Sequence, residues 1–68
     1  MRVLGIDPGL VASGYGIVDF NGRREALAEA GVIRAGGREL TARLCHIHRS
    51  VADILEEWRP EVLVIEEV

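Results

Sequence analysis

The order of apolar and polar residues divides the chain into four extended segments and one helix. Residues 2–7 carry aliphatic side chains on both faces, which is typical of a buried central strand. Residues 8–13 indicate a loop, and residues 15–20 a second strand. Asn21-Gly22 is the strongest short signal for a β-hairpin, so a third strand is expected to follow antiparallel to the second.

The third segment, residues 25–35, carries two conflicting signals. Residues 25–30 would suit a helix by intrinsic propensity. The Asn-Gly turn leads straight into the segment, however, and Val32-Ile33 followed by Gly36-Gly37 is typical of the end of a strand. We therefore predict a strand over residues 25–35.

Residues 38–58 predict a long amphipathic helix, because apolar side chains recur every three or four residues. The stripe consists of Leu40, Leu44, Ile47, Val51, Ile54, Leu55 and Trp58. We expect it to pack on the sheet, with Trp58 in the core and Cys45 as a small core hydrophobe. Arg59-Pro60 ends the helix, since proline disfavours helix in the residue before it. Residues 61–66 then predict a fourth buried strand that ends in acid.

These elements predict an α/β fold with a mixed sheet and one crossover helix. The helix is long enough to carry the chain back, so the fourth strand can run parallel to the first with the usual right-handed connection. If these two strands are neighbours, their carboxyl ends lie roughly 5 Å apart. In open α/β sheets this edge is where ligands bind.

Both of these strand ends carry acidic residues. Asp7 is expected on the same face as Gly5, and Glu66 on the same face as Val64, whereas Glu67 would point the other way. A carboxylate at the end of a buried strand is costly unless a cation compensates its charge. Mg²⁺ suits such a sparse pair, because it keeps several waters and takes its remaining ligands from phosphates. We therefore predict Asp7 and Glu66 as catalytic metal ligands.

The segment after Asp7 is poor in side chains, with glycine at positions 9, 14 and 16. A bulky ligand could approach the backbone closely there. Two metal ions held about 3.5–4 Å apart would activate a water and stabilise the leaving oxygen in phosphodiester hydrolysis. Two acids are few for that purpose, so we expect one or two further ligands from outside these residues.

Composition restricts the functional classes. The 68 residues make one domain at most, and the chain stops straight after an apolar run, so we expect it to be the N-terminal piece of a longer protein. No apolar run approaches the roughly 18 residues needed to span a bilayer, and a single cysteine, Cys45, fits a reducing compartment, so the cytoplasm is expected. The net charge of −3 argues against a strong non-specific nucleic-acid binder, although all eight basic residues are arginine.

Residues 1–9, together with Gly14-Tyr15-Gly16, resemble the opening of RuvC-type Holliday junction resolvases. The resemblance continues through Asn21-Gly22, the amphipathic helix, Arg59-Pro60 and the closing residues 64–67. It therefore covers the whole chain in order and spacing. The opening motif is moderately specific alone and strongly specific together with the terminal Ile-Glu pair.

The resemblance implies a ribonuclease H-like fold, with residues 1–68 as the N-terminal part of a single nuclease domain truncated after the fourth strand. It implies a magnesium-dependent, structure-specific endonuclease that resolves four-way (Holliday) DNA junctions in recombination and repair by paired symmetric nicks. Two Mg²⁺ ions per site, with Mn²⁺ as the alternative ion, a homodimer and a branch-migration helicase complex are implied as well. Asp7 and Glu66 match the family's first two metal-binding carboxylates. The remaining acids lie beyond Val68, so this piece is expected to be inactive alone.

Several alternatives remain open at this point. Asp7 could be a turn-forming residue before Pro-Gly. His46 and His48 lie two apart on a helix and cannot chelate one metal together. The actin-like and sugar-kinase group has a similar phosphate loop, but Ser13 is the only hydroxyl in this one. A resolvase-like nuclease that processes RNA and a non-catalytic oligomerisation module are further alternatives.

Overall fold

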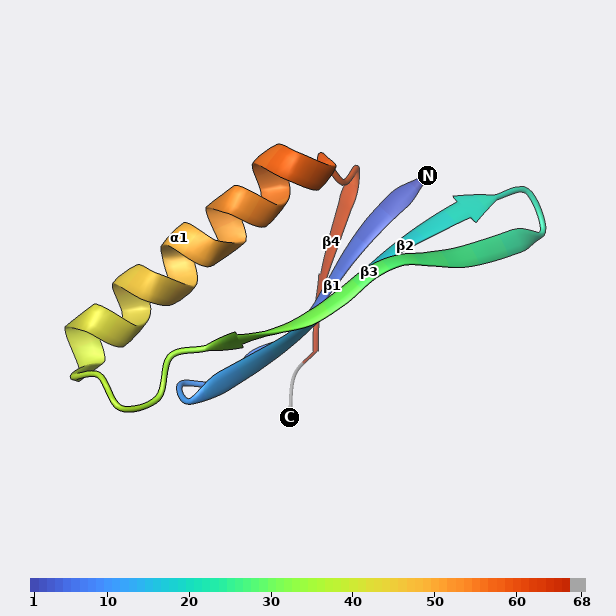
Figure 1. Ribbon diagram of the computed structural model, residues 1–68. Helices are drawn as coiled ribbons and strands as arrows, with labels where there is room; N and C mark the ends of the chain where they lie inside the picture. Colours follow the sequence, from blue (N-terminus) through green and yellow to red (C-terminus); the bar gives the residue numbers. More distant parts are fainter. Residues whose placement is uncertain (67–68) are drawn as a thin grey trace.

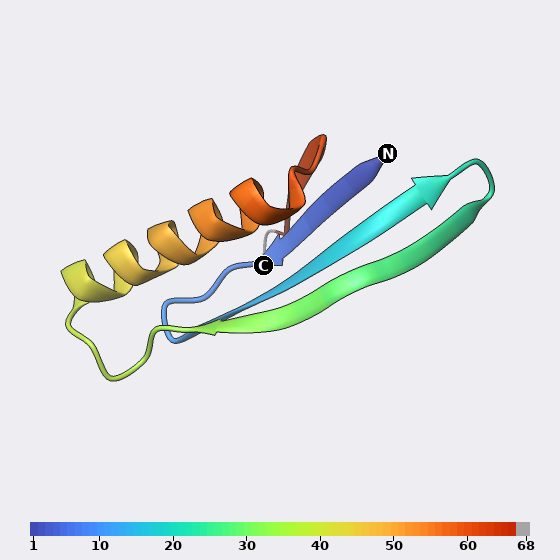
Figure 2. The ribbon, with the colours of Figure 1, turned by 45° about the horizontal axis from the view of Figure 1, so that its top comes forward.

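Four strands form one mixed sheet, and a helix covers one of its faces, in the computed structural model, which describes residues 1–66 (Figures 1 and 2). The elements in chain order are β1 (Arg2–Asp7), β2 (Ala12–Asn21), β3 (Arg24–Arg34), α1 (Leu40–Trp58) and β4 (Val62–Ile65). The strands lie in the order β3-β2-β1-β4. β1 is antiparallel to β2 and parallel to β4, as the sequence predicts for a crossover through a helix.

The predicted strands are confirmed, with shifted ends. β2 begins at Ala12 rather than at Tyr15, because its antiparallel pairing with β3 continues as far as Ala12 opposite Arg34. The loop after β1 therefore spans only residues 8–11. β3 is a strand in spite of its helix-forming residues 25–30, since ladder hydrogen bonds to β2 outweigh the small differences in intrinsic propensity.

The hairpin predicted at Asn21-Gly22 joins β2 to β3. Asn21 is paired with Arg24, so the two loop residues are Gly22 and Arg23. Gly22 has a φ of 63°, a left-handed conformation that glycine adopts without a steric penalty. The pairing shifts between Ile17 and Val18, where a bulge-like irregularity interrupts the β2–β3 register.

The core lies between α1 and one face of the sheet. Leu4, Ile17, Ile33 and Ile54 are buried there, one from each of β1, β2, β3 and α1. Partly buried side chains extend this cluster: Ile6, Tyr15, Ile47, Val51 and Trp58. The predicted place of Trp58 against the core is confirmed.

The helix has a defined start and stop. The Glu39 side chain accepts a hydrogen bond from the Ala42 backbone N–H at 3.0 Å and caps the first turn. At the other end, Arg59 adopts a left-handed conformation with φ 48°, and its N–H donates to the Leu55 carbonyl. Pro60 follows, in agreement with the predicted stop. No helix among residues 1–66 combines the length and apolarity needed to cross a membrane.

The predicted width of the buried helix stripe is wrong. Leu40, Leu44 and Leu55 are exposed, and so is Cys45, which was expected in the core. The helix contacts the sheet along the narrower line of Ile47, Val51, Ile54 and Trp58. Among residues 1–66 no element packs over the flanking apolar positions, so they are exposed.

The prediction that the fourth strand is buried is also wrong. The side chains of β4 are 39–59% exposed. Within the described residues β4 has one strand neighbour, β1, and the helix contacts mainly the other strands. Continuous apolar composition, which normally indicates burial on both faces, is here combined with an open edge.

Arg2 joins three elements at the start of the sheet. Its guanidinium binds Asp19 through two bonds, Nε to Oδ1 at 2.7 Å and Nη2 to Oδ2 at 2.9 Å. Its Nη1 donates to the Trp58 carbonyl at 2.9 Å, and the guanidinium lies 5.3 Å from the centre of the Trp58 ring. Arg2 thereby ties β1 and β2 to the last turn of α1.

Gly31 provides a first test of the packing. A Cβ at this position would lie 2.7 Å from Tyr15 Oη and 2.8 Å from ring atoms, whereas the Gly31 backbone has no left-handed φ. We predict that Gly31→Ala destabilises the protein by about 1–3 kcal/mol, because the Tyr15 ring must move. Urea unfolding should show this cost, and a Tyr15→Leu background should largely remove it. An equal cost in both backgrounds would contradict the steric explanation.

Asp19 provides a test by pH. The Arg2 hydrogen bond lowers the pKa of the Asp19 carboxyl below its usual range. A carboxyl with a lowered folded-state pKa stabilises the fold above its unfolded pKa, and this contribution is lost as pH falls through the folded pKa. We therefore expect part of the stability to disappear as the pH falls below about 4. Thermal unfolding from pH 7 to pH 2.5 should show a smaller acid-induced decrease for Asp19→Asn than for the wild type; identical decreases would contradict the prediction.

Candidate metal centre at the ends of β1 and β4

The parallel pairing of β1 with β4 brings Asp7 and Glu66 to the same level of the sheet. Ile6 pairs with Ile65, and the Glu66 N–H donates to the Ile6 carbonyl at 3.0 Å. Asp7 follows Ile6 and Glu66 follows Ile65, so these two residues come next in the same register. The proximity that the sequence predicts for the two strand ends is therefore present in the backbone.

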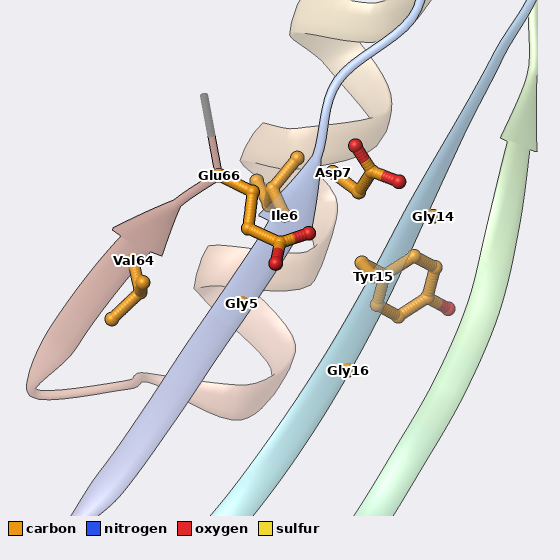
Figure 3. Close-up of a pocket in the computed structure, with 8 residues that line it drawn as sticks. All are labelled: Gly5, Ile6, Asp7, Gly14, Tyr15, Gly16, Val64 and Glu66. Carbon is orange, nitrogen blue, oxygen red and sulfur yellow. The ribbon is translucent and has the colours of Figure 1, made fainter. Parts of the chain in front are cut away.

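Both carboxylates lie on the face of the sheet that α1 leaves uncovered. Leu4 and Ile6 on β1 point to the core, so Gly5 and Asp7, which alternate with them, belong to the opposite face. Figure 3 shows Asp7 and Glu66 at the rim of one hollow, with the Glu66 side chain extending over β1. The predicted face of both residues agrees with the structure.

The hollow is shallow and has a volume of about 240 Å³. It is lined by Gly5, Ile6, Asp7, Gly14, Tyr15, Gly16, Val64 and Glu66. A Cβ added at Gly5 or Gly14 would meet nothing within 4 Å, and one at Gly16 would meet only Leu27 Cδ1, at 3.8 Å, and a backbone oxygen of Glu29. None of these three glycines has a left-handed φ, so backbone conformation does not require them. Their effect is to leave open space beside the acids.

In the part of the chain that the structure describes, neither Asp7 nor Glu66 forms an ion pair. The ion pair seen among residues 1–66 joins Arg2 to Asp19 and lies at the opposite end of β1. Asp7 is exposed. The prediction that burial makes its charge costly is therefore wrong. Two like charges on neighbouring strand ends repel each other, and a bound cation would relieve this repulsion.

The donor set fits a magnesium ion that is only partly coordinated by protein. Carboxylate oxygens are hard ligands, and Mg²⁺ characteristically combines one or two of them with waters and phosphate oxygens. No cluster of three or more acidic, histidine or cysteine side chains suited to a metal occurs in the part of the chain that the structure describes. Asp7 and Glu66 can therefore supply two ligands, and their assignment as metal ligands stays a prediction.

Hydrogen bonds between Ser13 and Gly9 close the loop between β1 and β2. Ser13 is 2% exposed, and its hydroxyl accepts a hydrogen bond from the Gly9 N–H and donates one to the Gly9 carbonyl, both at 2.9 Å. A Cβ at Gly9 would collide with the Ala12 carbonyl oxygen. The hydroxyl that a nucleotide-binding loop would need for phosphate is thus already occupied. This observation disfavours the kinase-like alternative.

Two features of the site were missed in the sequence. Ser13 was considered only as a possible phosphate ligand, although its position four residues after Gly9 suits a local loop-closing bond. Val64 was recognised as a face-mate of Glu66, but its place in the lining of the hollow was not predicted. Strand alternation was the available signal for Val64.

Comparison with known proteins identifies related sequences over the whole chain. The profile of the family described as "Crossover junction endodeoxyribonuclease RuvC" matches residues 3–68. The RuvC of Bartonella henselae is 38% identical over 69 residues, which cover 100% of this chain and 41% of that protein. The RuvC of Burkholderia lata is 46% identical over 68 residues, covering 100% of this chain and 38% of that protein. The chain thus spans about two fifths of the length of these relatives.

Solved structures give the same result for the fold. The structure of Thermus thermophilus RuvC in complex with a Holliday junction substrate matches with a TM-score of 0.91 and 31% identity, covering 100% of this chain and 44% of that one. A second Thermus thermophilus RuvC structure matches with a TM-score of 0.91 and 32% identity, covering 100% and 43%. The predicted ribonuclease H-like mixed sheet with one helix is confirmed.

The acid pair predicts a binding property that can be measured directly. We expect Asp7→Asn to weaken Mn²⁺ or Mg²⁺ binding at least about tenfold, because one of two charged ligands becomes neutral. Electron paramagnetic resonance of Mn²⁺ and calorimetry with Mg²⁺ are suitable measurements. Asp53→Asn, on the exposed side of α1, makes the same chemical change away from the hollow and should leave binding unchanged. Equal affinity of both variants would remove Asp7 from the metal site.

Proposed function

We propose a function for this chain from the fact that it belongs to the RuvC family of crossover junction endodeoxyribonucleases. In this proposal residues 1–68 form the N-terminal part of a single nuclease domain, truncated after β4. The complete protein is an endonuclease that hydrolyses phosphodiester bonds of four-way DNA junctions in recombination and repair. The observation that supports this most is the β1–β4 register, which sets Asp7 and Glu66 together at an open hollow.

Asp7 and Glu66 are proposed to hold two Mg²⁺ ions, with Mn²⁺ as the alternative. When bound, such ions polarise the scissile phosphate and lower the pKa of a bound water. The two carboxylates fix the position of this positive charge, because both extend from strands whose backbones are hydrogen-bonded to each other. Gly5 and Gly14 leave the space in which a sugar-phosphate backbone can approach the acids.

The proposed substrate is four-way junction DNA, which is the ligand of the Thermus thermophilus structure that matches this chain. A four-way junction has four strands that form two symmetry-related pairs, so paired symmetric nicks in one pair need two active sites related by a two-fold axis. We therefore propose a homodimer that acts in the cytoplasm with a branch-migration helicase complex. A net charge of −3 does not favour DNA binding, so we place the main DNA-contacting surface outside these residues.

The 68-residue piece is proposed to be inactive alone. Its hollow is open, and residues 1–66 contribute two metal ligands, fewer than two-metal hydrolysis uses. The relatives are longer than this chain. Additional carboxylates from the corresponding part of the complete protein would complete the site. In this proposal the N-terminal piece supplies the rigid half of the centre, because both acids are held by sheet hydrogen bonds.

Cleavage by the full-length protein tests this function. We predict that Asp7→Asn and Glu66→Gln each lower Mg²⁺-dependent cleavage of a synthetic four-way junction by at least about 10²–10³-fold, because each removes charge that stabilises the reacting phosphate. Junction binding in gel-shift assays should change little.

Matched controls on the outer face of α1 make the test specific. Asp53→Asn and Glu56→Gln repeat the two chemical changes at exposed positions and should retain cleavage within about twofold of the wild type. Full cleavage by Asp7→Asn would refute the assignment of Asp7. Absence of junction cleavage in the wild type, with cleavage of RNA instead, would favour the RNA-processing alternative.

A further inference from the structure

The position of β4 along β1 decides whether the two acids meet. β4 has only four residues, Val62–Ile65, and all of them are aliphatic and largely exposed. Because every residue of β4 is aliphatic, its sequence has no apolar–polar alternation that would select one register over the next. A shift by one residue would replace aliphatic side chains by aliphatic side chains within the strand, yet it would carry Glu66 to the other face of the sheet. Some other interaction must therefore fix the register.

The backbone N–H and carbonyl of Arg2 form hydrogen bonds with Glu61 at the beginning of the same ladder. The Arg2 N–H donates to Glu61 Oε1 at 3.3 Å, and the Glu61 N–H donates to the Arg2 carbonyl at 2.9 Å. These residues are 59 positions apart in sequence. Val3 and Val62 have the same offset, and so do Asp7 and Glu66. The Arg2–Glu61 contact and the acid pair therefore mark the two ends of one register.

The Arg2 side chain holds the end of α1, which lies three residues before Glu61. Its guanidinium is held on two sides, by the Asp19 carboxylate of β2 and by the Trp58 carbonyl in the last turn of α1. Only Arg59 and Pro60 separate Trp58 from Glu61, and Arg59 is in a left-handed conformation that turns the chain. The end of α1 is thus fixed relative to β1 within two residues of the start of β4.

We propose that Arg2 is a positioning residue for the metal site, because it sets the β1–β4 register that places Glu66 beside Asp7. This inference rests on the proposed function of the acid pair. Arg2 acts through the backbone: it lies five residues before Asp7, at the far end of β1, and does not touch the hollow. Its guanidinium suits the role, since it can bind a carboxylate and a carbonyl at once, which a lysine ammonium cannot do in the same planar geometry.

The register can be measured without any activity assay. In the full-length protein with Cys45→Ser, the pair Val3→Cys and Val62→Cys reports the native register, because directly paired strand residues lie within disulfide range. The pair Val3→Cys and Leu63→Cys reports a shift by one residue. We expect the native pair to cross-link at least about tenfold faster in the Arg2 protein, and this preference to fall below about threefold in Arg2→Met.

Cleavage supplies the second measurement. We expect Arg2→Met to lower kcat at least about tenfold and to raise the Mg²⁺ concentration for half-maximal rate, with junction affinity unchanged, because the carboxylates no longer share one face. Arg49→Met, on the exposed side of α1, removes the same charge and should match the wild type in cross-linking and in kcat. If Arg2→Met does not fold, Arg2→Lys should fold and show the same loss of cross-linking preference to a smaller degree.

The outcomes separate this inference from the proposed function. A folded Arg2→Met and a folded Arg2→Lys that keep the native cross-linking preference and the Mg²⁺ requirement would overturn the positioning role. If Asp7→Asn cleaves normally while Arg2→Met loses the native preference, the proposed function fails but the register control by Arg2 stands. Loss of both the preference and the Mg²⁺ affinity, with Arg49→Met unaffected, supports the positioning role.

Discussion

The parallel pairing of β1 with β4 is the constraint on which the rest of the site depends. It joins two segments that are 59 residues apart, and its last hydrogen bond, from the Glu66 N–H to the Ile6 carbonyl, lies directly beside the two acids. The backbone ladder therefore keeps the two acidic residues side by side whether or not a ligand is present.

The two faces of the sheet differ in what they contact. One face packs against α1 and contains the buried core of Leu4, Ile17, Ile33 and Ile54. The other carries the acids and the row of glycines, which have no packing or conformational reason in the described residues. A glycine inside a strand costs roughly 0.5–1 kcal/mol relative to alanine. The glycines accept this cost and leave open space beside the two acids.

Much of this architecture could be predicted from the sequence. The period of the helix, the Asn-Gly turn and the aliphatic runs correctly gave the elements, and strand alternation gave the face of Asp7 and Glu66. The exposure of β4 and of Cys45 could not be predicted, because composition does not reveal which neighbours cover an apolar residue. The Ser13–Gly9 hydrogen bonds and the contacts of Arg2 could not be predicted for a different reason. They depend on side-chain directions at chain reversals, for which no periodic pattern exists.

The connectivity of the sheet has a consequence for the time order of folding. β1, β2 and β3 form a meander with short connections, so their pairings close small loops. β4 joins last in sequence and must close a loop of nearly sixty residues, which is slower and entropically costlier than closing a hairpin. The two acids should thus become neighbours only after the other three strands have paired. A nascent chain would then keep Asp7 and Glu66 apart until the β1–β2–β3 meander has already formed.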